Sequence, residues 1–146
     1  MKLRRMFLDG RLFHVYNRGN RRNPIFNKER DYHRFVKLLK RYEVKCLVIV
    51  YGYCLMLNHF HLLLKQAKNG SIPKFMQCLC ISHAMYLNKK YYMVGHVFQG
   101  RYKAKGIITG SSRRRVVRYI KENPVKENLV EESSIYKWLE IRSGTL

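Results

Sequence analysis

The chain places two apolar, β-branched runs almost end to end. The first, VKCLVIVYGYCLM, spans 44–56, and the second, NHFHLLLK, spans 58–65. The gap between them is too short for a helical crossover, so we expect the runs to pair as an antiparallel hairpin. Every other element has to be arranged around this hairpin.

Side chains alternate between the two faces of a strand, which divides the second run into two sets. Phe60, Leu62 and Leu64 share one face, whereas His59 and His61 share the other. A lone histidine on a strand usually packs in the core or lies half exposed, but two neighbouring rings on one face both need polar partners. The pair predicts a metal site formed by both rings, with two packed rings as the alternative.

The rest of the chain alternates between strand and helix patterns. We expect a strand at 12–19, a helix at 28–42, the hairpin strands at 44–56 and 58–65, a helix at 71–91, a strand at 95–108, a helix at 111–123 and a short amphipathic segment at 135–141. This order is a split βαβ pattern. It predicts an α+β, ferredoxin-like fold in one domain over 1–146, with an antiparallel sheet and helices packed on one face.

Small polar residues mark the expected helix starts. The candidate N-caps are Asn27 for the first helix, Ser71 for the second and Ser111 or Ser112 for the third. Pro124 is expected to stop the third helix, because proline disfavours helical backbone in the residue before it. Asn123 is then expected at or next to the end of that helix.

The charge balance is strongly positive, with 30 Lys and Arg against 9 Asp and Glu and a formal net charge of +21. Such an excess predicts a polyanionic partner, and nucleic acid fits best because neutralised phosphates release counterions. The basic residues are spread along the chain and not gathered on one amphipathic helix, which argues against a membrane surface. No segment resembles a signal peptide or membrane span, so we expect a cytoplasmic, nucleoid-associated protein with reduced cysteines.

A second candidate constellation lies on the predicted third helix. Tyr119 and Asn123 are one helical turn apart and share a face, and Arg115 lies one turn earlier on the same side. A tyrosine on a basic helix is more often a stacking or core residue than a nucleophile. With 11 tyrosines in the chain, the residue type alone does not single out Tyr119.

The segment CLCISH suggests an alternative metal site. Cys78, Cys80 and His83 are ligand types for zinc, but no second cluster in the sequence completes such a site. On a helix Cys78 and Cys80 point to different faces, which favours packing over a zinc-structured adaptor.

Four stretches of the sequence resemble a known family. They are FHVYNRGNRRNPIF at 13–26, YCLMLNHFHLLLK at 53–65, GHVFQGRYKA at 95–104 and RYIKENPVKENLV at 118–130. In this order and spacing they resemble the single-tyrosine HUH transposases, and within them the REP-associated tyrosine transposases of bacteria. The resemblance covers about 13–130 of the chain.

The resemblance implies a metal-dependent enzyme that cleaves and joins single-stranded DNA through a 5′-phosphotyrosine. It implies Tyr119 as the nucleophile and His59 and His61 as ligands of Mg²⁺ or Mn²⁺. Asn123 stands where better-studied relatives carry a glutamine ligand, and its side chain is one methylene shorter. Lys121 or a water on the metal ion is a candidate for taking the Tyr119 proton.

The implied substrate is a hairpin-forming single strand, bound by a protein that is a monomer or a homodimer. Candidate phosphate contacts are Arg18, Arg21, Arg22, Arg101, Lys103, Lys105, Arg113, Arg114 and Arg115. Candidate aromatic residues for stacking on unpaired bases are Tyr16, Phe98 and Tyr102. The rival interpretation is a non-catalytic nucleic-acid-binding module on the same fold. Neither hairpin strand carries the aromatic signature of an RNA-binding sheet.

Overall fold

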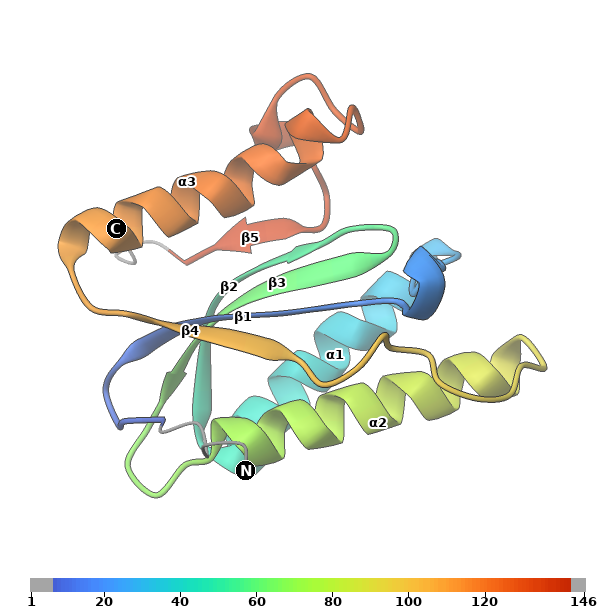
Figure 1. Cartoon of the computed structure of the whole chain (residues 1–146), viewed down its shortest axis with the longest axis horizontal. Helices are drawn as coiled ribbons and strands as arrows, with labels where there is room; N and C mark the ends of the chain where they lie inside the picture. The colour runs from blue at the N-terminus through green and yellow to red at the C-terminus, as the bar shows by residue number, and fades with distance from the viewer. Residues whose placement is uncertain (1–6, 143–146) are drawn as a thin grey trace.

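The computed structural model describes residues 7–142 (Figure 1). Its strands are β1 (Leu12–Arg18), β2 (Val48–Leu55), β3 (His59–Gln66), β4 (Lys103–Ile107) and β5 (Leu139–Ile141). Its helices are α1 (Glu29–Cys46), α2 (Ile72–Lys90) and α3 (Gly110–Lys126), with short 3₁₀ turns at Asn20–Arg22 and Ser133–Ile135. Among these residues no helix is long and apolar enough to cross a membrane.

The strands of residues 7–142 form a five-stranded antiparallel sheet in the order β4-β1-β3-β2-β5. The predicted hairpin is present: Cys54 of β2 stands opposite His61 of β3. β3 lies between β1 and β2, and β1 lies between β3 and β4, which is the arrangement of two split βαβ units. The predicted α+β, ferredoxin-like fold is confirmed.

The helices divide between the two faces of the sheet (Figure 1). α1 and α2 cover the face of Phe60, Leu62 and Leu64 and form the main core with them. α3 lies on the opposite face, where Val117 and Ile120 pack with Leu63 in a second apolar cluster. The expectation of helices on one face therefore holds for α1 and α2, and α3 departs from it because its own apolar stripe covers the histidine face.

Two strand boundaries differ from the sequence prediction. α1 continues to Cys46, and Leu47 then ends it in the left-handed conformation (φ 53°), so β2 begins at Val48 and not at 44. The helical apolar stripe runs on through the buried Tyr42 and Cys46, and this tertiary packing outweighs the β propensity of the segment. β4 begins at Lys103, and the segment before it contributes an isolated bridge between Phe98 and Gly19.

Of the three predicted helix starts, one matches the structure. Ser71 caps α2 by accepting a hydrogen bond from the Lys74 backbone. The cap of α1 is Lys28, not Asn27, because the Asp31 carboxylate reaches back to the backbone there. The cap of α3 is Thr109, whose hydroxyl accepts from the Ser112 backbone, so Ser111 and Ser112 lie inside the helix.

Pro124 does not end α3, which contradicts the prediction. The helix continues to Lys126, and the Glu127 N–H donates to the Asn123 carbonyl at 3.1 Å. Proline removes one backbone donor, a modest loss so near the helix end, and the Pro124 ring itself is buried. Asn123 is consequently a buried residue within the helix, with 7% of its surface exposed.

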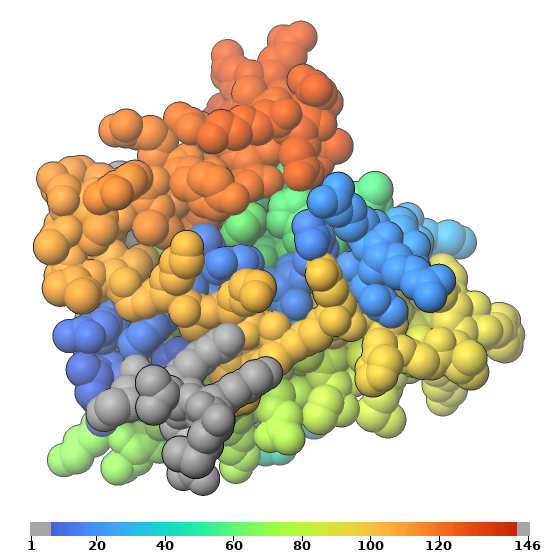
Figure 2. Space-filling model, viewed as in Figure 1, coloured from blue at the N-terminus to red at the C-terminus, as the bar shows by residue number. Residues whose placement is uncertain are grey.

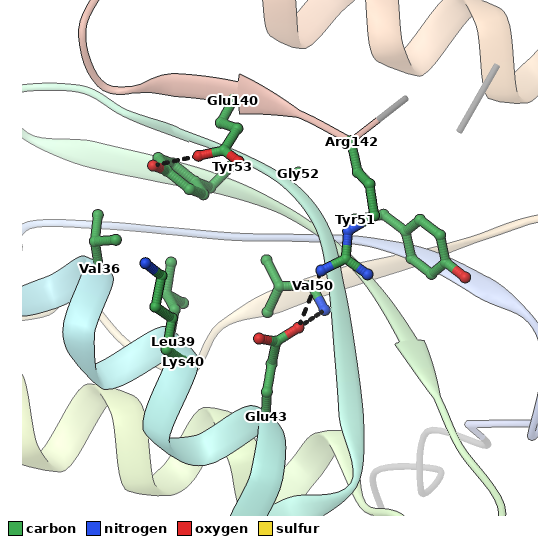
Figure 3. A pocket seen from close by; sticks show the side chains of 10 residues that line it. All are labelled: Val36, Leu39, Lys40, Glu43, Val50, Tyr51, Gly52, Tyr53, Glu140 and Arg142. Atoms are coloured by element: carbon green, nitrogen blue, oxygen red, sulfur yellow. Dashed lines mark hydrogen bonds and ion pairs between the residues drawn. The ribbon is translucent and has the colours of Figure 1, made fainter. Parts of the chain in front are cut away.

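The C-terminal segment covers the outer edge of β2. β5 pairs with β2 from Gly52 to Cys54, and the Leu55 N–H donates to the Trp138 carbonyl. Figure 3 shows the pocket of about 70 Å³ between this edge and α1. There Glu43 accepts from the Val50 N–H at 2.7 Å and pairs with Arg142, which links α1 to the end of β5.

A buried carboxylate joins α1 to α2. Asp31 accepts hydrogen bonds from Lys90 Nζ (2.7 Å), the Tyr86 hydroxyl (2.7 Å) and the Tyr91 hydroxyl (2.6 Å). The same side chain accepts from the backbone that starts α1. One residue therefore starts the first helix and holds the end of the second against it.

Candidate active site

The paired histidines of β3 meet the side-chain amide of Asn123 on α3. His59 Nε2 lies 3.2 Å from Asn123 Oδ1, and His61 Nε2 lies 3.4 Å from Asn123 Nδ2. The strand alternation and the apolar stripe of α3 together produce this meeting, because Val117 and Ile120 dock the helix on the histidine face. The three side chains predicted as metal ligands thus converge on one point.

The other ring nitrogens are held by hydrogen bonds. His59 Nδ1 lies 2.7 Å from Asn58 Oδ1, and in the tautomer that donates this hydrogen bond Nε2 keeps its lone pair for a metal ion. His61 Nδ1 lies 3.0 Å from His14 Nε2 of the neighbouring strand β1. Such outer partners fix the ring orientation and tautomer of metal-binding histidines.

Burial keeps two of these rings neutral. Burial lowers the pKa of His61 to about 3, and His14 and His59 add to this effect. Burial also lowers the pKa of His14 to about 4, with a smaller contribution from the positive charge of Lys105. A neutral imidazole has a free nitrogen lone pair, which a metal ligand requires.

Tyr119 lies one helical turn before Asn123. Its ring meets the His61 ring edge-on, with centroids 5.5 Å apart and an interplanar angle of 88°. The side chain is 45% exposed, so a substrate can reach it from solvent. The ammonium group of Lys126 lies over its ring, 5.6 Å from the ring centroid.

The sequence interpretation missed two residues of this site. His14 is on β1, two positions before Tyr16. The sequence signal for it was this i, i+2 pair of ring side chains, on a strand that the predicted fold places beside 58–65. Glu127 places Oε1 3.8 Å from His59 Nε2. The sequence signal for Glu127 was its spacing of one helical turn after Asn123. We did not use this spacing because we expected the helix to stop at Pro124.

The side chains fit a divalent ion. Imidazole nitrogens suit Mn²⁺, and an amide oxygen suits Mg²⁺ and Mn²⁺ alike. The Asn123 amide can offer its oxygen to either ring position by a flip of the side chain. Over residues 7–142, no group of three or more His, Cys, Asp or Glu side chains is gathered as metal ligands would be.

Some of the predicted phosphate contacts lie close to the paired histidines, and others lie elsewhere. Lys103 and Lys105 of β4 stand opposite Tyr16 and His14, so they point to the histidine face and are exposed. Arg21 and Arg22 are exposed on a turn whose Arg22 carbonyl accepts from Asn58, the neighbour of His59. The remaining candidates occupy three other positions: Arg18 donates to Gln99, Arg101 is exposed before β4, and Arg113, Arg114 and Arg115 lie on the first turns of α3.

The three predicted stacking residues have different surroundings. Tyr16 lies at the site, with its ring 5.9 Å from that of His61. Phe98 is half-buried and lies edge-on to Phe60. The prediction for Tyr102 is wrong, because its ring is only 6% exposed and belongs to the main core.

The alternative zinc cluster is not assembled. His83 is buried among aromatic rings and its Nε2 lies 2.7 Å from the Ile25 carbonyl. Cys78 lies beside Cys46 of α1, whereas Cys80 lies beside Asn17 of β1. The two thiols therefore pack in different places.

The surface of α3 (orange) lies against the blue and green surface of the strands in Figure 2.

The same architecture occurs in two solved structures. A REP-associated tyrosine transposase bound to a REP hairpin matches with a TM-score of 0.78 and 17% identity, covering 95% of this chain and 81% of that one. A Deinococcus radiodurans R1 protein designated a transposase matches with a TM-score of 0.57 and 17% identity, covering 84% of this chain and 97% of that one.

The sequence comparison with curated proteins gives no match. The family model for IS200-like transposases, in contrast, matches residues 10–123, which hold β1, the paired histidines, Tyr119 and Asn123. That span is most of the chain. The chain therefore belongs to the IS200-like transposase family.

Proposed function

We propose that this transposase is a metal-dependent endonuclease and strand transferase that acts on single-stranded, hairpin-forming DNA. Tyr119 forms a 5′-phosphotyrosine intermediate, and His59, His61 and Asn123 hold Mg²⁺ or Mn²⁺. The observation that carries the proposal is the meeting of both Nε2 atoms at the Asn123 amide, 3.2 and 3.4 Å away, one turn beyond an exposed tyrosine.

The proposed reaction is a transesterification at a phosphodiester of the DNA. The Tyr119 hydroxyl gives up its proton as its oxygen forms a bond to phosphorus. The bond from phosphorus to the 3′-oxygen breaks, and that oxygen takes up one proton and leaves as a 3′-hydroxyl, so no net proton is consumed. A second 3′-hydroxyl reverses the step, so joining needs no nucleotide cofactor. When bound, the divalent ion neutralises negative charge on the phosphate oxygens.

The other residues position the reacting groups. α3 holds Tyr119 beside the histidines, so the attacking oxygen and the phosphate meet without a search through solution. Lys126 lies over the Tyr119 ring, where its ammonium group can contact a phosphate brought to the tyrosine. His14 and Asn58 keep the histidine rings turned toward Asn123.

Two features support hairpin DNA as the substrate: the positive charge of the chain and its similarity to a solved transposase structure. The net charge of +21 and the exposed lysines of β4 favour binding of phosphates. The structural relative that was solved with a REP hairpin supports a hairpin as the partner here. A DNA substrate of this kind would place the protein at the nucleoid. The acting species is a monomer or a homodimer.

The test is a trapped covalent adduct. Incubation of labelled hairpin DNA with Mn²⁺ should give a protein–DNA species on a denaturing gel, and Tyr119→Phe should abolish it because only the hydroxyl is removed. Tyr92→Phe is the control, since Tyr92 is 96% exposed and follows α2 instead of lying on α3. Mass spectrometry should place the phosphotyrosine on residue 119; a modified peptide lacking that residue would refute the assignment. Tight hairpin binding by the wild type without any adduct would favour the non-catalytic binding module.

A further inference from the structure

The Glu127 carboxylate lies beside His59 of the paired histidines, and the proposed reaction gives it no role. Its Oε1 is 3.8 Å from His59 Nε2, the same nitrogen that lies 3.2 Å from Asn123 Oδ1. We propose that Glu127 is a further protein ligand of the divalent ion, adding a carboxylate oxygen to His59, His61 and Asn123. The inference rests on the proposed function, because it concerns the metal of that site.

The continuation of α3 brings this carboxylate to the site. Glu127 is the C-cap residue of α3, one helical turn after Asn123, so the two side chains lie on the same side of the helix end. The Glu127 N–H donates to the Asn123 carbonyl, which holds the two residues in helical register beyond Pro124. A helix that ended at Pro124 would direct the chain away before Glu127.

The separations suit ligands of one ion. Adjacent ligands of an octahedral Mg²⁺ at about 2.1 Å lie about 3 Å apart, and opposite ligands about 4 Å apart. The separations of 3.2 Å and 3.8 Å from His59 Nε2 fall in this range. Glu127 approaches His59 without completing a cluster with His61, but its side chain is 47% exposed and can turn toward the shared point at little cost.

The charge of the site also calls for a carboxylate. Two imidazoles and an amide are neutral donors, and the chain as a whole carries a formal charge of +21 that repels cations. Lys105 beside His14 and Lys126 over Tyr119 add positive charge locally. A carboxylate oxygen offsets this charge and is the donor type that Mg²⁺ prefers.

The experiment is a calorimetric titration of the full chain with Mn²⁺ in the absence of DNA. Glu127→Gln and Glu127→Asp should each weaken Mn²⁺ binding about tenfold or more, since loss of even an outer-shell partner costs that much. Glu127→Asp keeps the charge but shortens the side chain by one methylene. Glu122→Gln is the matched control: it removes a carboxylate from the same helix that pairs with Lys126, and it should leave the affinity unchanged.

Two outcomes would overturn the inference. Wild-type affinity in both Glu127 variants would show that the carboxylate does not bind the ion. Wild-type affinity in Glu127→Asp with weak binding in Glu127→Gln would show a general charge effect instead of ligation. The titration needs no DNA, so it is independent of the adduct assay: Glu127-dependent Mn²⁺ binding in a protein that forms no Tyr119 adduct would refute the proposed reaction and leave this ligand in place.

Discussion

His61 is the residue on which the site is built. It contacts His14 through Nδ1, Asn123 through Nε2 and Tyr119 through the edge of its ring. A side chain with these three neighbours has little freedom to turn. The site is therefore ordered before any substrate arrives, which favours catalysis by positioning.

Substitution of either histidine of β3 should separate chemistry from folding. We expect His59→Ala and His61→Ala to abolish the adduct while hairpin binding, measured by gel shift, stays near the wild-type level. His61 is buried, so its loss should also lower stability by about 1–2 kcal/mol, and the half-buried His59 should cost less. His33→Ala, on the exposed side of α1, is the control. Adducts that persist in both variants alongside a lower melting temperature would mean that the rings serve packing alone.

At the scale of elements, the sequence predicted those helices and strands whose pattern involves only residues that are near one another in the chain. The hairpin of β2 and β3 and the apolar stripes of the helices are local patterns, and they were predicted. The end of α1 was not, because packing of Tyr42 and Cys46 against the sheet extends the helix into a β-favouring segment. The convergence of His59 and His61 with Asn123 was suggested by family resemblance, whereas His14 entered the site through strand pairing.

The Asp31 junction between α1 and α2 should make stability depend on pH. Burial by itself raises the pKa of Asp31, but hydrogen bonds from Lys90, Tyr91 and Tyr86 outweigh it and hold the pKa well below the ordinary value of 3.8. The folded protein thus favours the charged form. This contribution is fully present above about pH 4 and is lost as the pH falls toward the folded-state pKa.

Asp31→Asn tests that junction. At pH 7 we expect a loss of about 2 kcal/mol, because buried donors lose their charged acceptor, and a melting temperature lower by roughly 5 °C. The deficit should shrink in thermal melts recorded at progressively lower pH below about 4. Glu29→Gln, whose exposed carboxylate pairs with Lys137 on the surface, should change the melting temperature little. An equal deficit at all pH values would show that the charge of Asp31 is not what stabilises the junction.

At the scale of the whole molecule, the positive charge should dominate DNA affinity. For about six phosphate contacts, log affinity should fall with log salt concentration with a slope of roughly −4 to −5. Replacing both Lys103 and Lys105 by Gln should reduce the magnitude of that slope by roughly 1.4–1.8, as each lysine accounts for one contact. The slope is measured by fluorescence anisotropy with a labelled hairpin over a series of KCl concentrations. A flat dependence would contradict the nucleic-acid interpretation.

The position of β4 gives these lysines a second consequence. Among the described residues β4 pairs with β1 alone, so its outer backbone groups form an open edge, whereas β5 covers the edge of β2. Open edges are templates for pairing with another copy of a chain, and short strands bearing lysine resist such growth. Lys103 and Lys105 therefore repel a second molecule as well as attracting DNA, and an edge rebuilt without them would lose affinity for DNA and gain a route to aggregation.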